Sequence, residues 1–270
     1  MNMNEEVISA PRFLVTKEYR RFEEFCAACR RERYIGICYG PPGVGKTLSA
    51  RQYAKWDLLE GRDPLAAGGA VPVEIANCQS VLYTPPVTNT PRAVRSALDD
   101  GLILLRGLVG RARGSVHPDG QMDFSVQCEL VMVDEADRLS TPSLEELRDF
   151  YDRRETGLVL IGMPGLEKRL ARYPQLYSRV GFAHAFRPLS QEETRFVLEE
   201  HWQAWGGTIR GNEFADQEAV AAIITITAGN FRLINRLMSQ VRRIKELNRL
   251  STVTREVVDA ARDCLVIGTV

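Results

Sequence analysis

The most constraining feature of the sequence is the stretch of residues 40–47, which reads Gly-Pro-Pro-Gly-Val-Gly-Lys-Thr. It fits the pattern G-x-x-x-x-G-K-[ST], and it lies between an apolar run at 34–39 and a predicted helix at 46–59. Glycines in this pattern let backbone N–H groups approach phosphate oxygens, and the amino end of the helix adds partial positive charge. The chain is therefore expected to contain a strand–loop–helix unit that binds a nucleoside triphosphate.

Four polar side chains are expected to complete this site. Lys46 supplies a charge to the β- and γ-phosphates, and the Thr47 hydroxyl is a predicted Mg²⁺ ligand. Asp134 follows the apolar run 130–133, where a second Mg²⁺ ligand is needed, and Glu135 can orient or deprotonate an attacking water. The residues predicted to contact ATP are Gly40, Pro41, Pro42, Gly43, Val44, Gly45, Lys46, Thr47 and Leu48.

Apolar runs and helical periodicity alternate along most of the chain. Short apolar runs at 34–39, 130–133 and 158–161 predict buried strands, and 80–83 is expected to form another strand. Helices are expected from Pro91 to about 108 and after 140. This alternation predicts an α/β fold with a doubly wound parallel sheet. From 190 onward only helices are predicted, with breaks at 206–207 and Gly229. The expected domains are an N-terminal helical extension (1–33), an α/β nucleotide-binding core (34–188) and a helical lid (189–270).

Composition narrows the possible environments and partners. The 270 residues carry 35 basic and 35 acidic side chains, so binding to a polyanion depends on local charge separation. The segments 12–55 and 232–255 are locally basic.

The sequence has no apolar run long enough for a transmembrane helix and no signal-peptide pattern at its start, so we expect a cytoplasmic protein. Its six scattered cysteines agree with a reducing compartment, and Cys26 and Cys29 have no second pair with which to bind zinc.

The layout of a phosphate-loop core followed by a helical lid resembles an AAA+ ATPase, from about residue 13 to the end of the chain. Residues 134–149, which begin Asp-Glu-Ala-Asp-Arg-Leu-Ser, are similar to the transposition regulators MuB, TniB and TnsC. So are residues 157–166, Gly-Leu-Val-Leu-Ile-Gly-Met-Pro-Gly-Leu. The same strings also resemble the ExeA-like secretion ATPases.

The resemblance implies roles for three further residues. Met163 occupies the sensor 1 position, where AAA+ proteins usually carry a polar side chain; a thioether cannot donate a hydrogen bond, so slow, switch-like hydrolysis is expected. Arg232, in the string 229–232, matches the sensor 2 arginine of the lid. Arg179 matches an arginine finger that reaches the nucleotide of a neighbouring subunit, with Arg172 as the competing position.

A DNA-binding role is also implied by this resemblance. Unfoldase-type AAA+ proteins carry an aromatic–hydrophobic–glycine triplet after the second strand, and residues 84–92 contain none. In similar proteins, loops from this part of the core line a helical assembly around duplex DNA. Thr90, Arg92, Arg111 and Arg113 are therefore predicted to contact DNA phosphates without reading sequence.

Together these features predict an ATP- and Mg²⁺-dependent regulator of DNA transposition. It would form a homo-oligomeric ring or filament on double-stranded DNA, and its partners would be a transposase and a target-selection protein. Three alternatives remain: an ExeA-like ATPase that serves a protein complex, a clamp or helicase loader, and a signalling switch.

Overall fold

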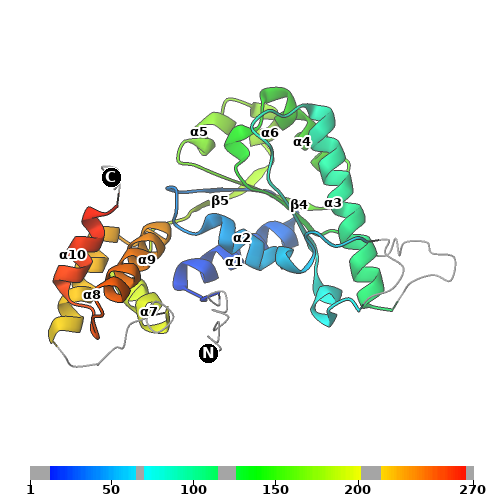
Figure 1. The fold of residues 1–270 in the computed structure, drawn as a ribbon. Coiled ribbons are helices and arrows are strands. Elements are labelled where there is room, and N and C mark those ends of the chain that lie inside the picture. The colour runs from blue at the N-terminus through cyan, green and yellow to red at the C-terminus, as the bar shows by residue number, and fades with distance from the viewer. Residues whose placement is uncertain (1–12, 65–69, 115–125, 202–213, 266–270) are drawn as a thin grey trace. The chain divides into compact units, whose positions relative to one another are not determined.

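The computed structural model describes residues 13–64, 70–114, 126–201 and 214–265. Within them, five strands form one sheet in the order β2-β3-β4-β1-β5, and every neighbouring pair is parallel (Figure 1). The predicted doubly wound parallel sheet is therefore confirmed. The strands are β1 Ile35–Tyr39, β2 Ser80–Tyr83, β3 Leu130–Val133, β4 Gly157–Gly162 and β5 Val180–Ala185.

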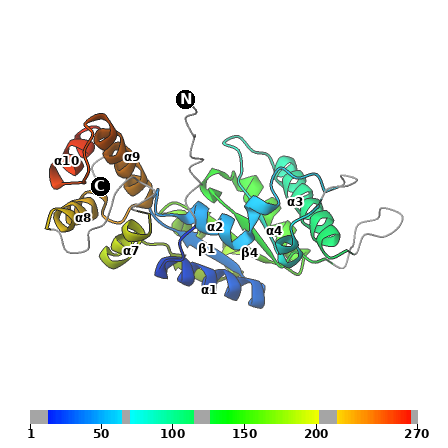
Figure 2. The same cartoon turned by 60° about the horizontal axis from the view of Figure 1, so that its bottom comes forward.

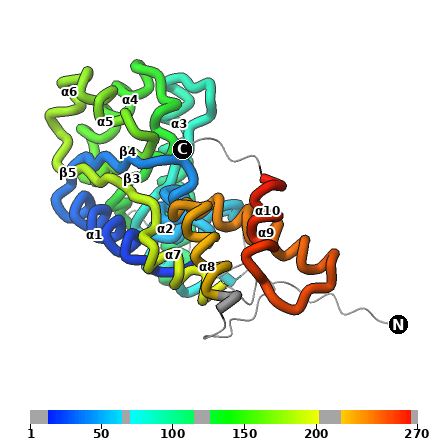
Figure 3. Tube along the Cα trace, turned by 90° about the vertical axis from the view of Figure 1, so that its left-hand side faces the viewer, coloured from blue at the N-terminus to red at the C-terminus, as the bar shows by residue number. Residues whose placement is uncertain are grey.

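Helices cover both faces of this sheet. Because crossovers between parallel strands are right-handed, the connection from β1 outward to β2 lies on one face and the returning connections lie on the other. Figures 1 and 3 show α1 on one side of the sheet and α4, α5 and α6 on the opposite side. The helices of this part are α1 Lys17–Glu32, α2 Lys46–Ala54, α3 Pro91–Ala112, α4 Thr141–Asp152, α5 Leu166–Leu170 and α6 Pro174–Tyr177. Three 3-10 turns accompany them: η1 Trp56–Leu58, η2 Val73–Asn77 and η3 Ala136–Arg138.

Two helix ends differ from the sequence prediction. The helix after the phosphate loop was expected to continue to residue 59, but α2 ends at Ala54. Lys55 adopts a left-handed conformation with φ 51°, which stops the helical hydrogen bonding, and η1 follows. Helix α3 starts at Pro91 as predicted, with the Thr90 hydroxyl accepting a hydrogen bond from Ala93 N, but it continues to Ala112.

Helix α1 is fitted closely against the sheet. A Cβ on Gly36 would lie 2.4 Å from the Cys29 sulfur, and one on Gly157 would lie 2.6 Å from the Cys29 carbonyl oxygen. Glycine at these two strand positions therefore allows the helix backbone to approach β1 and β4. Phe22 and Phe25 of α1 extend this contact by packing on His184 of β5. The N-terminal helix thus covers the sheet.

The chain divides into two compact units. One holds residues 19–42 and 46–186; the other holds 1–18, 43–45 and 187–270. The second unit contains α7 Gln191–His201, α8 Phe214–Thr227, α9 Phe231–Leu247 and α10 Arg255–Asp263 (Figure 2). These helices pack around an apolar cluster. The predicted break at Gly229 is present, with φ 74°, whereas 206–207 lies outside the described residues. The cluster includes Val197, Leu198, Ile223, Ile234, Leu237, Met238, Val241 and Val258.

The described residues contain no helix long and apolar enough to cross a membrane. They also contain no group of three or more His, Cys, Asp or Glu side chains that could hold a metal ion. All six cysteines are present as free thiols in the structure.

Thiol labelling should separate the exposed cysteine from the buried ones. Burial raises the pKa of the Cys29 thiol to about 12 and that of Cys26 well above its ordinary value, whereas Cys264 is exposed. Because only the thiolate reacts, Cys26 and Cys29 should react with Ellman's reagent at pH 8 at least about 100-fold more slowly than Cys264 in the native protein. Cys264→Ser should remove the fastest phase; retention of that phase would show that another of the six thiols is equally accessible.

Candidate nucleotide-binding site

The phosphate loop begins where β1 meets its neighbouring strands. Gly40 N donates to Gly162 O at 3.3 Å, at the end of β4. A Cβ on Gly40 would lie 2.2 Å from Phe186 O, which follows β5. Only glycine therefore lets the chain leave β1 so close to both neighbours.

The middle of the loop uses glycine for conformation and for space. Gly43 and Gly45 have φ values of 79° and 109°, a region that other residues rarely adopt. A Cβ on Gly45 would meet no other heavy atom within 4 Å, so open space borders the backbone there. The loop thus has the glycines and the room that a bound phosphate group requires.

The side chain of Lys46 is held in place by two carbonyl groups of the loop backbone. The nearly buried Lys46 amine donates to Gly40 O at 2.6 Å and to Pro41 O at 2.8 Å. Lys46 is also the first residue of α2, so its charge lies at the positive end of the helix. Positive charge from both sources makes this position suited to an anion such as a triphosphate.

Thr47 and Asp134 meet although 87 residues separate them in sequence. The Thr47 hydroxyl donates to Asp134 Oδ2 at 2.6 Å, and Asp134 is buried directly after β3. The other Asp134 oxygen accepts from Glu135 N at 2.9 Å. Hydroxyl and carboxylate oxygens are the hard ligands that Mg²⁺ prefers, so this pair fits a magnesium ion beside the phosphate loop.

Glu135 adopts an unusual conformation and has a cationic neighbour. Its φ of 51° places a non-glycine residue in the left-handed region. The Glu135 carboxylate forms an ion pair with Arg138, whose guanidinium also donates to Pro85 O at 3.2 Å. Since Asn89 Nδ2 donates to Arg138 O at 2.9 Å, the segment after β3 is tied to the segment after β2.

Asp137 lies at this end of the sheet, and no role was predicted for it from the sequence. Its Oδ2 accepts from Met163 N at 2.6 Å, and its backbone carbonyl accepts from Arg169 at 2.7 Å. Met163 itself presents an exposed thioether after β4. The polar side chain beside the end of β4 therefore comes from η3. In the sequence, Asp137 is marked by its place three residues after Asp134.

Arg179 lies at the amino ends of the strands, whereas the phosphate loop lies at their carboxyl ends. Its carbonyl accepts from Ile35 N at 3.2 Å, at the amino end of β1, whereas the loop follows Tyr39 at the carboxyl end. A strand advances about 3.3 Å per residue, so the length of β1 separates the two positions. The backbone of Arg179 is therefore separated from the phosphate loop of its own chain by the length of β1.

Arg232 belongs to the same compact unit as Gly43–Gly45. The Asn230 side chain caps α9 by accepting from Leu233 N at 3.1 Å, and Arg232 N donates to Gly43 O at 2.9 Å. The start of α9 is therefore hydrogen-bonded to the middle of the phosphate loop, while the Arg232 side chain is exposed.

The four predicted DNA-contacting residues do not form one cluster. Thr90 and Arg92 lie at the start of α3, whereas Arg111 and Arg113 lie at its end. At 1.5 Å per helical residue, Arg92 and Arg111 are about 28 Å apart. Arg111 donates to Asp63 O at 3.2 Å and Arg113 to Ala76 O at 3.0 Å, so both brace loops of their own chain.

Comparisons with known proteins agree with this geometry. The family model described as an AAA domain matches residues 29–170, more than half of the chain. A potential ATP-binding protein of Staphylococcus aureus is 44% identical over 268 residues, which cover 95% of this chain and 97% of that protein. The Mu-like prophage FluMu DNA transposition protein B of Haemophilus influenzae is 26% identical over 243 residues, covering 85% of this chain and 72% of that protein.

A solved structure shows the same fold. The Thermotoga maritima RuvB Holliday junction branch migration motor matches with a TM-score of 0.60 at 16% identity, covering 97% of this chain and 74% of that one. At this identity the likeness concerns the fold alone. The chain belongs to the AAA domain family, with an AAA+ phosphate-loop core and similarity to the transposition protein B of a Mu-like prophage.

Proposed function

We propose that this chain is an ATP-dependent, non-sequence-specific DNA-binding regulator of DNA transposition. In this proposal it assembles on target DNA in the cytoplasm with ATP and Mg²⁺ bound, and it recruits or stimulates a transposase, with or without a target-selection protein. The observation that carries the proposal is the phosphate loop with its acidic pair, in a chain similar along most of its length to a DNA transposition protein B.

Each residue of the site has a task in nucleotide binding and hydrolysis. A bound Mg²⁺ supplies charge neutralisation at the phosphates, and Thr47 and Asp134 would hold it. Lys46 offsets the charge of the β- and γ-phosphates. Glu135 accepts the proton of the attacking water, and its ion pair with Arg138 opposes that protonation.

Assembly couples one subunit to the nucleotide of the next. The backbone of Arg179 is separated from its own loop by the length of β1, so we assign it to the neighbouring subunit's phosphates, where a guanidinium stabilises transition-state charge. Arg232 reports nucleotide to the helical unit through the start of α9.

Repetition of weak contacts explains how a chain with no net charge could hold DNA. Arg92 is exposed at the start of α3, and no polar partner for its side chain occurs among the described residues. A single arginine–phosphate contact is weak, but many subunits on one duplex add their contacts and give a steep dependence on salt. Arg111 and Arg113 would contact DNA phosphates separately, from the other end of α3.

Fluorescence anisotropy with a random-sequence duplex tests the proposal. We expect binding to be at least about tenfold tighter with a slowly hydrolysed ATP analogue and Mg²⁺ than with ADP, because only the assembled form presents many contacts at once. Arg92→Ala should weaken binding and reduce the salt slope. Arg153→Ala is the matched control, because this exposed arginine pairs with Asp149 on α4.

Two outcomes would contradict the proposal. Equal affinity for duplex DNA with and without nucleotide would show that DNA binding does not depend on ATP. Nucleotide-dependent assembly without any DNA binding would favour an ExeA-like ATPase that serves a protein complex.

A further inference from the structure

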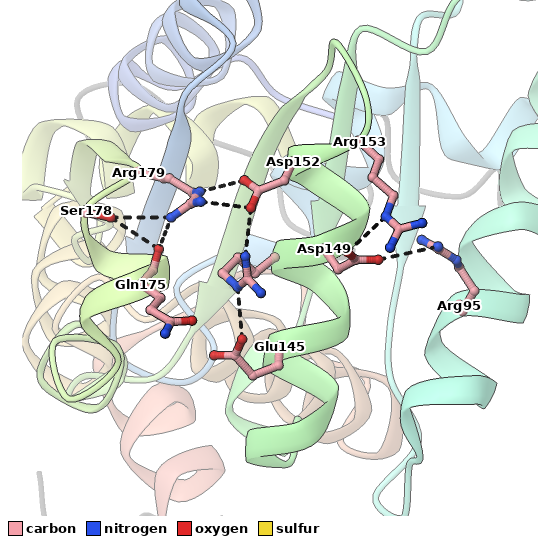
Figure 4. A network of polar contacts seen from close by, with 9 residues as sticks. Arg95, Glu145, Asp149, Asp152, Arg153, Gln175, Ser178 and Arg179 are labelled. Atoms are coloured by element: carbon pink, nitrogen blue, oxygen red, sulfur yellow. Dashed lines mark hydrogen bonds and ion pairs between the residues drawn. The ribbon is translucent and has the colours of Figure 1, made fainter.

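The guanidinium of Arg179 is already engaged within its own subunit. Its Nε donates to Asp152 Oδ1 at 2.5 Å and its Nη2 to Asp152 Oδ2 at 2.8 Å, a two-point contact with one carboxylate (Figure 4). Its Nη1 donates to the carbonyl of Gln175 and to Ser178 Oγ. All three nitrogens therefore have partners, and no edge of the guanidinium offers two unengaged donors to a phosphate.

Asp152 is held in place without help from Arg179. It is the last residue of α4, and its Oδ2 also accepts from Arg148 Nη1 at 2.8 Å. Arg148 in turn donates from Nε to Glu145 Oε2 at 2.9 Å, one turn earlier on the same helix. Figure 4 shows this row of side chains continuing from Arg179 through Asp152 to Glu145. Departure of Arg179 would thus leave Asp152 with a cationic partner.

We propose that Asp152 acts as a latch: it holds the Arg179 guanidinium on its own subunit until the phosphates of a nucleotide bound to a neighbouring subunit compete for that guanidinium. This inference rests on the proposed role of Arg179 in a neighbour's site. The guanidinium must give up the two-point contact with Asp152 in order to bind phosphate oxygens in the same two-point manner. Asp152 is therefore a positioning residue that sets the threshold for assembly.

The exposure of the pair makes such an exchange feasible. The side chains of Arg179 and Asp152 are 33% and 29% exposed, so water weakens their attraction and can solvate either partner when they separate. A triphosphate offers more negative charge than one carboxylate, and this favours transfer of the guanidinium once a neighbour is in place.

The variant Asp152→Asn removes the charge of the latch and keeps its size. With a slowly hydrolysed ATP analogue and Mg²⁺, light scattering should show assembly at a protein concentration about threefold to fivefold lower than for the unaltered protein. The affinity of the unassembled protein for a fluorescent ATP analogue should not change. Asp152→Ser is a second, smaller variant with the same expected direction, should the asparagine variant fail to fold.

Two matched controls come from the same helix. Asp149→Asn removes a carboxylate that pairs with Arg153 and Arg95 but not with Arg179. Glu145→Gln removes the second carboxylate partner of Arg148. Neither should lower the assembly threshold. Asp152→Asn should not restore assembly to Arg179→Ala, because the latch acts only through the group it holds; restored assembly in the double variant would show that Asp152 acts without Arg179.

The outcomes distinguish failure of the proposed role of Asp152 from failure of the proposed role of Arg179. If Arg179→Ala abolishes assembly but Asp152→Asn leaves the threshold unchanged or raises it, the latch is wrong and the trans role of Arg179 stands. If Arg179→Ala assembles normally, the trans role fails and the latch fails with it. Loss of assembly in Arg172→Ala would then identify the competing arginine, which is exposed and has no polar side-chain partner in the part of the chain that the structure describes.

Discussion

Replacement of Lys46 by alanine is expected to reduce affinity for ATP about 100-fold, because two charge-assisted contacts to phosphate are lost at once. The Lys46 amine is already placed at the loop by the carbonyls of Gly40 and Pro41. Both the charge and its position therefore disappear in the variant. Titration with a fluorescent ATP analogue measures the affinity, and light scattering measures the ATP-dependent assembly, which should disappear at concentrations that saturate the unaltered protein.

Lys168→Ala is the control for this variant. Lys168 is an exposed lysine of α5, so its removal changes the net charge by the same amount without touching the loop. Equal loss of affinity in the two variants would mean that overall charge, rather than the phosphate loop, determines nucleotide binding.

Replacement of Glu135 by glutamine should reduce ATP hydrolysis by about 100-fold to 10,000-fold while nucleotide binding persists. Glutamine keeps the size of the side chain but cannot accept a proton from water. Asp134 and Thr47 remain in place, so the predicted magnesium ligands are intact. Single-turnover hydrolysis measures the effect, and assemblies on DNA should last longer because their nucleotide is not consumed.

Glu155→Gln removes an exposed carboxylate that pairs with Arg33, and it should leave hydrolysis unchanged. Hydrolysis by Glu135→Gln at the rate of the unaltered protein would exclude Glu135 as the base. A loss of ATP affinity in Glu135→Gln would instead point to a structural role for its ion pair with Arg138.

Elements that depend on local pattern were predictable from the sequence. An uninterrupted apolar run identified β3 with its observed bounds, because strands buried on both faces need such runs. The strand predicted at 80–83 also has the bounds of β2. Pro91 marked the start of α3 for a similar local reason. The phosphate loop was predictable because its glycines, lysine and threonine are contiguous in sequence.

Contacts between distant segments were not predictable in the same way. The pair of Arg179 with Asp152 and that of Met163 with Asp137 join residues 27 and 26 positions apart. Either arginine or aspartate could equally have faced solvent, since charged side chains near a surface have many possible partners. The end of α2 at Ala54 depends on the left-handed backbone conformation of Lys55, which lysine does not signal.

The four residues predicted to contact DNA lie at the two ends of one helix. Arg92 and Arg111 were grouped because both lie in the same part of the core. Helix α3 continues to Ala112, which places the two arginines at opposite ends of one rigid element. They can contribute to the same DNA interface only if that interface is as long as the helix or is formed by different subunits.

Electron microscopy of the protein with random-sequence duplex DNA tests the central claim most directly. With a slowly hydrolysed ATP analogue and Mg²⁺, the unaltered protein should form regular rings or filaments along the DNA, and Lys46→Ala should leave the DNA bare. Equally dense coating of the DNA without nucleotide, or by Lys46→Ala, would contradict the claim that nucleotide-driven assembly creates the DNA-binding form.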